Sequence, residues 1–536
     1  MSLKYLDLYS LVGKGYFPRE LPPPFSTSLF ARKVSDDWGG YYSLFNGNQR
    51  CITKSAIHSI PRVGALRRKI SIPNPISFAK MAYKIVENKN EIDTVISSDT
   101  HSVTHPVARD SEERAIVPSS WFEDFPKIRA RERAGARYVL KADISKFYDS
   151  IYTHSIPWAT HGKKVAKMKR RPGDLYSNVL DQCLRDMQDG QTVGIPMGPD
   201  TSFVISELVL SKVDELICEN VKMKWFRFID DFEFSCISMG EVERVISALE
   251  GSLSHFELQL NPSKLHIVEL PDEIDTQWAA EMRTIYISED GPVAQYYSLL
   301  NYFNKISKYI KLYPDQSVAK YCVSRLASTS IKDENKRFVF DFLMQCCSSS
   351  PACLPEVIEM LYRNYGDTKK GVLSVLEVEI FSVTIFSLIN RCLDVNHTNE
   401  IAWAIWACIL FDIDIPVDLF RKIIATSDCI VLILALDAYQ KRLVTCSVDL
   451  AVLDNLITDE SYCDETWLFA YESCAQGWLN PLVNPINKNA TFSRMNNDGV
   501  KFYDSITAPL DLMAEVPIDR SERPDTDARA WQYFRR

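Results

Sequence analysis

Hydrophobic and polar residues alternate differently in the two parts of the chain. Up to about Pro271, short apolar runs with the period of strands are mixed with longer runs at helical spacing, and Pro and Gly separate them. This mixture is typical of an α+β domain. The expected strands cover 138–141, 225–235, 255–260 and 265–270, and the expected helices cover 202–217 and 241–253.

Beyond about Gln295 the strand pattern fades, and apolar runs of about 10 to 18 residues at helical spacing follow one another. These runs predict an all-α, HEAT-like array of stacked helical pairs, although no sequence repeat accompanies them. The expected helices lie around 338–347, 355–365, 401–411 and 419–426. We therefore expect an α+β unit over 1–275, a boundary at 276–295, a helical domain over 296–480 and a polar, irregular segment over 481–536.

The net charge of −9, from 61 Lys and Arg against 70 Asp and Glu, disfavours a nucleic-acid binder if it is taken alone. The charge is unevenly distributed, however. Residues 127–171 contain 13 basic and three acidic residues, whereas residues 372–480 contain 16 acidic and five basic ones. The acidity therefore belongs to the helical part, and the basic stretch is either a phosphate-binding surface or a solvated face.

Composition also bears on the compartment. The longest apolar runs, 401–411 and 429–436, are too short to span a bilayer, and the N-terminus lacks the basic flank and apolar core of a signal peptide. The 14 cysteines include no Cys-x-x-Cys pair, so they indicate reduced thiols rather than a zinc site or a disulfide framework. We expect a soluble, cytoplasmic protein without a membrane partner.

Two segments carry candidate metal ligands. In YVLKADISKFYDSI, an apolar strand delivers Asp143 at its end, where an isolated Asp is more often a cap or turn residue. In WFRFIDDFEFS, alternating aromatics flank the pair Asp230 and Asp231, which predicts a hairpin with two carboxylates at its turn. An exposed acidic turn is the alternative. Adjacent carboxylates in apolar surroundings repel each other, and Mg²⁺ is their natural partner.

Three further segments have features that fit the same site as these carboxylates. The Gly/Pro-rich turn 194–199 permits close approach of the backbone and leads into an apolar helix. Downstream, Asn261 and Pro262 predict a turn, with Lys264 on the next strand. Upstream, RRKISIPNP places a cation cluster before a rigid turn, and such a cluster is suited to a triphosphate.

Together these segments resemble reverse transcriptases. Asp143, the Gly-x-Pro-x-Gly turn, Phe-Ile-Asp-Asp-Phe and the Lys264 segment follow the order and approximate spacing of motifs A to D, and RRKISIPNP resembles the fingers segment. The stretches 15–25 and 152–164 look like those of prokaryotic abortive-infection enzymes, which act in phage defence. The resemblance covers about 15–270, and the helical part matches that group only in general character. It implies a right-hand polymerase palm and fingers.

The resemblance implies a role for each matching residue. Asp143 and Asp230 would ligate two Mg²⁺ ions, which Mn²⁺ can replace, and Asp231 would complete the carboxylate cluster. Lys264 would protonate or neutralise pyrophosphate. The remaining residues would contact the incoming nucleotide, with Tyr148, for which core packing is the alternative, excluding a ribose 2′-OH: Arg68, Lys69, Tyr148, Gly194, Pro196, Met197 and Gly198.

Two departures from conventional enzymes matter. Met197 stands where many templated reverse transcriptases have Gln, and an acidic helical part replaces a strand-rich thumb. Both are features of the abortive-infection group. The resemblance therefore implies a Mg²⁺-dependent, homo-oligomeric DNA polymerase that uses dNTPs without a template and leaves single-stranded DNA attached to the protein. A conventional RNA-templated enzyme of retron or group II type and a non-catalytic scaffold are the alternatives.

Overall fold

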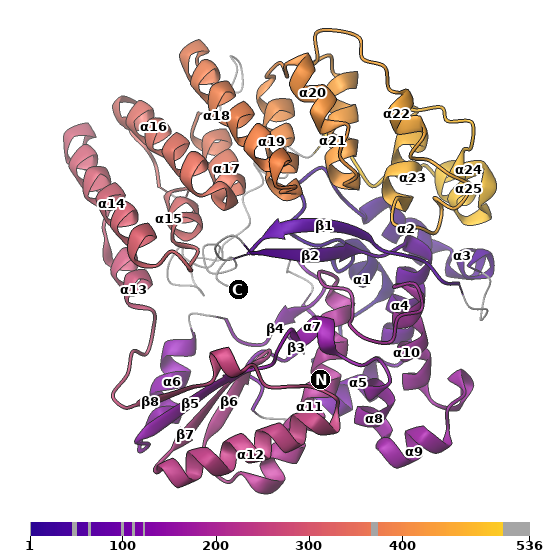
Figure 1. Ribbon diagram of the computed structural model, residues 1–536, viewed down its shortest axis with the longest axis vertical. Coiled ribbons are helices and arrows are strands. Elements are labelled where there is room, and N and C mark those ends of the chain that lie inside the picture. The colour runs from indigo at the N-terminus through magenta and orange to yellow at the C-terminus, as the bar shows by residue number, and fades with distance from the viewer. Residues whose placement is uncertain are drawn as a thin grey trace.

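The computed structural model describes residues 2–45, 51–62, 66–97, 101–109, 113–121, 124–327, 329–365 and 373–507. Figure 1 shows a twisted sheet with its helices at the bottom, a two-stranded hairpin near the middle and an arch of helices across the top. The α+β class and the helical C-terminal region are both confirmed. Within the described ranges, no helix has both the length and the apolar character needed to cross a membrane.

The lower part is built on a four-stranded antiparallel sheet in the order β6-β7-β5-β8, which we call the palm sheet. Its strands are β5 (Tyr138–Asp143), β6 (Trp225–Phe228), β7 (Asp231–Cys236) and β8 (His266–Glu269). The alternation read from the sequence corresponds to one buried face, on which the rings of Phe232 and Phe234 stack beside Trp225.

Helices cover this sheet and connect its strands. The long α11 (Asp200–Asn220) is buried over most of its length, and α12 (Met239–His255) buries an apolar stripe. The other elements of this part are α6 (Phe125–Arg133), α7 (Phe147–Ser150), α8 (Ser155–His161), α9 (Lys163–Met168), η2 (Pro172–Asp174), α10 (Tyr176–Asp186) and η3 (Pro262–Lys264).

The N-terminal segment supplies a second antiparallel pair, β1 (Ala56–Pro61) with β2 (Arg67–Ile72), which we call the fingers hairpin. It lies between the palm sheet and the arch of helices (Figure 1). Asn74 caps the following helix through its side chain, and Pro75 occupies its first turn, so this helix begins directly after the hairpin. The other elements are α1 (Leu8–Lys14), α2 (Ser28–Asp36), α3 (Trp38–Leu44), α4 (Pro75–Glu87), α5 (Lys89–Ile96), β3 (Pro106–Val107) and β4 (Val117–Pro118).

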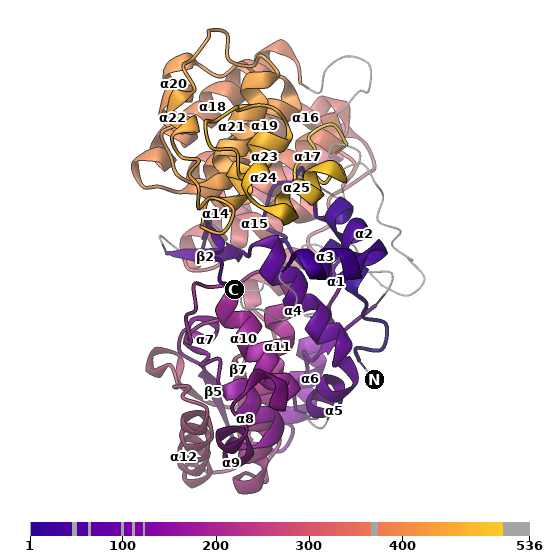
Figure 2. The ribbon, with the colours of Figure 1, turned by 90° about the vertical axis from the view of Figure 1, so that its right-hand side faces the viewer.

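The remaining chain forms the helical region. Figures 1 and 2 show its helices rising from the palm and crossing above the fingers hairpin. The expected helices 338–347, 355–365 and 401–411 lie within helices of this region, whereas 419–426 extends past a helix that ends at Ile423. The elements are α13 (Gln277–Thr284), α14 (Pro292–Leu312), α15 (Val318–Leu326), α16 (Asp333–Ser349), η4 (Pro351–Cys353), α17 (Leu354–Tyr365), α18 (Val375–Asp394), α19 (Thr398–Phe411), α20 (Val417–Ile423), α21 (Cys429–Gln440), α22 (Ala451–Asp454), α23 (Trp467–Ala475), α24 (Pro485–Lys488) and α25 (Ala490–Asn497).

The segment after residue 481 is more ordered than its polar composition predicts. It contains α24 and α25, and Phe502 is fully buried. The Phe502 ring lies 5.6 Å from Phe17 and 5.7 Å from Phe30, so aromatic packing holds this segment against the N-terminus. The expectation of an irregular segment is therefore wrong for 485–497, and 508–536 lies outside the described residues.

Two local predictions also differ from the structure. Residues 255–260 are not a strand, because α12 runs to His255 and only Leu260 forms an isolated bridge, to Ile144. Lys264 ends the η3 turn rather than lying on β8. The cations 67–69 lie on β2, which ends just before the predicted turn at 73–75, so the hairpin itself presents them.

Candidate active site

The palm sheet brings two of the predicted carboxylates together. In the antiparallel register of β5 and β7, Asp143 lies directly opposite Asp231. Asp230 is the residue before β7, and its carbonyl accepts a hydrogen bond of 3.3 Å from the amide of Ile144. Asp143 is 5 % exposed, whereas Asp231 is open to solvent. All three residues therefore lie at the same end of the two central strands.

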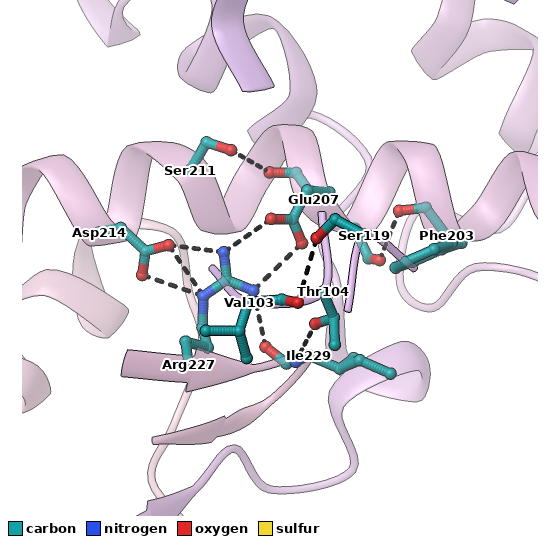
Figure 3. Close-up of polar contacts among 10 residues, drawn as sticks. Val103, Thr104, Ser119, Phe203, Glu207, Ser211, Asp214, Arg227 and Ile229 are labelled. Carbon is teal, nitrogen blue, oxygen red and sulfur yellow. Dashed lines mark hydrogen bonds and ion pairs between the residues drawn. The ribbon is translucent and has the colours of Figure 1, made fainter. Parts of the chain in front are cut away.

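A buried network of ion pairs and hydrogen bonds supports the turn that carries Asp230 (Figure 3). Arg227 on β6 is fully buried and donates hydrogen bonds to Glu207 and Asp214 of α11 at 2.9 and 2.5 Å. Its Nη1 also donates to the carbonyl of Ile229 at 2.8 Å, and the Ile229 amide donates to Thr104 Oγ1 at 2.9 Å. Ile229 has a left-handed backbone (φ 51°), which these contacts hold in place.

The carboxylates strongly influence one another. Removal from water and the charge of Asp143 raise the pKa of Asp230. Partial removal from water and the charges of Asp230 and Asp143 raise the pKa of Asp231. A nearby positive charge would relieve this repulsion, so the site has the electrostatics of a cation-binding cluster.

The last residue of η3 and the residue that caps it contact Asp143. The Lys264 ammonium lies 2.5 Å from Oδ2, and Asn261 Nδ2 donates to Oδ1 at 3.1 Å. Burial lowers the pKa of Lys264, but the hydrogen bond to Asp143 and the neighbouring carboxylates raise it overall. The predicted D-motif lysine therefore lies at the first carboxylate.

The site's donor chemistry fits a hard divalent cation. Carboxylate oxygens are the ligands that Mg²⁺ prefers, and the repulsion within this set is the kind that a cation removes. In the described part of the chain, no three acidic, His or Cys side chains already converge as a preformed metal cage. Because Lys264 and Asn261 occupy both oxygens of Asp143, a metal ion would replace at least one of these contacts.

The fingers hairpin faces this end of the palm. Burial and the nearby Arg62 lower the pKa of Arg68, whereas the charge of Asp230 raises it, so Arg68 lies within electrostatic range of that carboxylate. Lys69 lines a cleft of about 350 Å³, a size in the range of small-ligand sites. Residues 194–197 line the same cleft, together with Lys54, Ser71 and Asp149.

The Gly/Pro-rich turn closes one wall of this cleft. The amide of Ser71 on β2 donates to the Met197 carbonyl at 2.8 Å, which joins the fingers hairpin to the turn. Gly198 has φ 121°, and a Cβ there would lie 2.6 Å from Cγ of Pro18. Gly194 has φ 87° and a Cβ would lie 3.3 Å from the Asp149 carbonyl. Both glycines are therefore required by backbone conformation and by close approach.

Tyr148 connects the segment that carries Asp143 with the Gly/Pro-rich turn 194–199. It is half-buried on α7, its carbonyl accepts a hydrogen bond of 2.9 Å from the Ile195 amide, and its ring packs edge-on against Phe147 at 5.4 Å. The backbone contact links the segment after Asp143 to the Gly/Pro-rich turn. Its ring is not among the groups that line the cleft.

Sequence reasoning missed several residues that support this site. Arg227 is one, and its signal was an Arg at an inward position of an otherwise aromatic strand. Glu207 and Asp214 are others, and they lie seven residues apart on one face of an apolar helix. Asn261 was predicted as a turn residue, but its contact with Asp143 depends on tertiary structure.

The fold and the site together define a polymerase domain with a right-hand palm and fingers. Residues 70–288 match the family model for reverse transcriptase (RNA-dependent DNA polymerase). The chain therefore contains a reverse transcriptase domain, a nucleotidyltransferase of the RNA-directed DNA polymerase family.

Solved telomerase structures are also similar to the chain. The apo telomerase of Candida tropicalis truncated from its C-terminal domain matches with 13 % identity over 46 % of this chain and 56 % of its own, at a TM-score of 0.31. The longer apo telomerase of that organism matches with 10 % identity over 80 % and 72 %, at 0.30. Telomerase from Candida albicans with a telomeric RNA fragment matches with 10 % identity over 68 % and 69 %, at 0.28. The chain thus spans just over half of the first of these structures.

Proposed function

We propose that this protein is a Mg²⁺-dependent DNA polymerase that builds single-stranded DNA from dNTPs without a template, starting from a hydroxyl group of the protein itself. We further propose that it acts as a homo-oligomer in the bacterial cytoplasm, in abortive infection against phages. The reverse transcriptase domain supports the polymerase activity. Priming, template independence and the defence role rest on the resemblance of residues 15–25 and 152–164 and on the two features discussed below.

The observation that carries the polymerase activity is the placement of Asp143 opposite Asp231, with Asp230 on the adjoining turn and Lys264 at the first carboxylate. Bound Mg²⁺ would supply Lewis-acid activation of the attacking hydroxyl and of the leaving pyrophosphate. The three carboxylates would hold the metal. Once Lys264 is released from Asp143, its ammonium can donate a proton to, or neutralise, the departing pyrophosphate.

The cleft between the fingers hairpin and residues 194–197 supports binding of the incoming nucleotide. Lys69 lines it, and Arg68 lies within electrostatic range of Asp230, so cations and carboxylates flank the same space. Charge-assisted contacts of this kind suit a triphosphate. We propose that Tyr148 borders the sugar and that the Gly194 to Gly198 turn approaches it through its backbone.

Two features support synthesis without a template. Met197 provides no side-chain amide at the position where templated enzymes often have Gln, and its carbonyl is occupied by Ser71. The helical region that follows the palm carries the acidic stretch 372–480, which would repel a long duplex. Both features favour a polymerase that does not bind a template–primer duplex as templated enzymes do.

The purified protein tests this proposal directly. We expect DNA to remain bound to the protein after denaturation and to be released only by nuclease or protease digestion. Asp230→Asn should abolish this product, because one ligand charge is lost while the side-chain shape is kept. Glu243→Gln, an exposed carboxylate on α12, is the matched control and should retain the product. Absence of both attached DNA and dNTP incorporation in the native protein would contradict the proposal.

A further inference from the structure

We propose that residues 163–171, which we call the basic arm, form a docking surface for the phosphate backbone of single-stranded nucleic acid. The inference deepens the proposed function, on which it rests, by assigning a second contact outside the active site. The arm consists of α9 and the residues that follow it, and it contains six basic residues and no acidic ones. Nothing in the polymerase chemistry described above uses it.

The cations of the arm are available to a ligand. Lys164, Lys167, Lys169 and Arg170 are all exposed. The three lysines form no ion pair with any residue that the structure describes, and Arg170 Nε donates to the Lys167 carbonyl at 2.7 Å rather than to a carboxylate. Six cations without a carboxylate among them create a positive field that attracts an anionic ligand such as a phosphate backbone.

The base of the arm is firmly attached to the palm. The Lys163 ammonium lies 4.1 Å above the Trp158 ring, donates to the His255 carbonyl at 3.3 Å and lies 3.9 Å from Glu257. His255 ends α12, and the chain continues from there to Asn261 and the η3 turn at Asp143. The arm therefore projects from a rigid base that is shared with the active site.

The position of the arm favours a nucleic-acid strand that stays clear of the acidic region. In Figures 1 and 2, α9 lies at the foot of the palm, at the opposite end of the molecule from the helical arch. The arm is too short and too uniformly charged for an interfacial membrane helix, and Met168 is its one large exposed apolar residue. Flexible lysines contact phosphates without reading bases, so binding should be independent of sequence.

Salt-dependent binding tests this inference. Full-length Asp230→Asn, a background expected to carry no DNA of its own making, is titrated with a fluorescent oligothymidylate at several salt concentrations. The arm variant adds Lys167→Gln, Lys169→Gln and Arg170→Gln. At ~0.7 per phosphate contact, losing three contacts should reduce the slope of log Kd against log salt by about two and weaken binding about 100-fold at ~0.1 M salt.

The control variant removes three exposed cations from the helical region, through Arg421→Gln, Lys422→Gln and Arg442→Gln, so the net charge changes equally. It should leave the slope unchanged, and thermal unfolding verifies that both variants fold. Equal slopes for the arm and control variants would overturn the inference. Binding of the same variants to phosphatidylserine vesicles is measured in parallel. If the arm variant loses vesicle binding but keeps oligonucleotide binding, the inference is overturned and the arm is a membrane surface. Arm-dependent binding in a protein that never incorporates dNTPs would refute the proposed function alone.

Discussion

Arg67 and Glu400 join the fingers hairpin to helix α19 through a bidentate ion pair, with Nη1 and Nη2 of the guanidinium 2.5 and 2.8 Å from the two carboxylate oxygens. Nearby, His58 of β1 is fully buried and lies 2.7 Å from Asp428. Arg68, the next residue on β2, lies within electrostatic range of Asp230. The helical region therefore holds the strand that carries the candidate triphosphate ligands.

We predict that Glu400→Gln weakens nucleotide binding more than it slows the chemical step. The Glu400 side chain is 4 % exposed, so its removal leaves the Arg67 charge without a partner and loosens β2. KM for dNTP should rise at least about fivefold, equivalent to ~1 kcal/mol, with little change in kcat. Asp418→Asn, which breaks the exposed pair with Arg421, is the control. A folded variant with an unchanged KM would contradict this role.

Gly198→Ala should strain the turn beneath the fingers. The left-handed backbone and the 2.6 Å approach to Pro18 leave no space for a methyl group. We expect a loss of about 1–3 kcal/mol in unfolding free energy, measured by chemical denaturation. Gly173→Ala adds a methyl group where no atom lies within 4 Å, and it should be nearly neutral. Similar stability of the two variants would show that the turn can relax.

The buried Glu356 should make the free energy of unfolding depend on pH. It is 1 % exposed, and burial raises its pKa from 4.5 to about 7, although Lys320 at 3.6 Å opposes the shift. The folded protein therefore binds this proton more tightly than the unfolded chain does. The resulting stability is fully present below about pH 4.5 and is lost as the pH rises through about 7.

Glu356→Gln removes this dependence. Relative to the native protein, the variant should gain about 2 kcal/mol of unfolding free energy between about pH 5 and pH 8. Parallel urea titrations at the two pH values measure this gain. Glu359→Gln, which pairs with Arg363 at a more exposed position on the same helix, should show no such trend. A difference that stays constant with pH would mean that Glu356 titrates normally.

The carboxylates and the Gly/Pro-rich turn could be predicted from the sequence because their signals are local. Asp143 at a strand end, the pair Asp230 and Asp231 between alternating aromatics, and the turn 194–198 each lie within a short segment. The palm strands followed from the same alternation. The strand expected at 255–260 failed because α12 continues through its first residue.

The support of the site could not be predicted in this way. Arg227 contacts Asp214, 13 residues away, and Arg67 contacts Glu400, 333 residues away. Only the fold brings such pairs together, and burial gives them their strength. The polar tail was misjudged for the same reason, because Phe502 obtains its apolar partners from the N-terminus rather than from its neighbours in sequence.

Incorporation of labelled dNTPs, with and without an added RNA template and resolved on a denaturing gel, is the most direct test of the central claim. The account predicts label that migrates with the protein, that does not require the template and that disappears in Asp230→Asn. Label found only in free DNA, with a sequence dictated by the added template, would contradict it and identify a conventional reverse transcriptase.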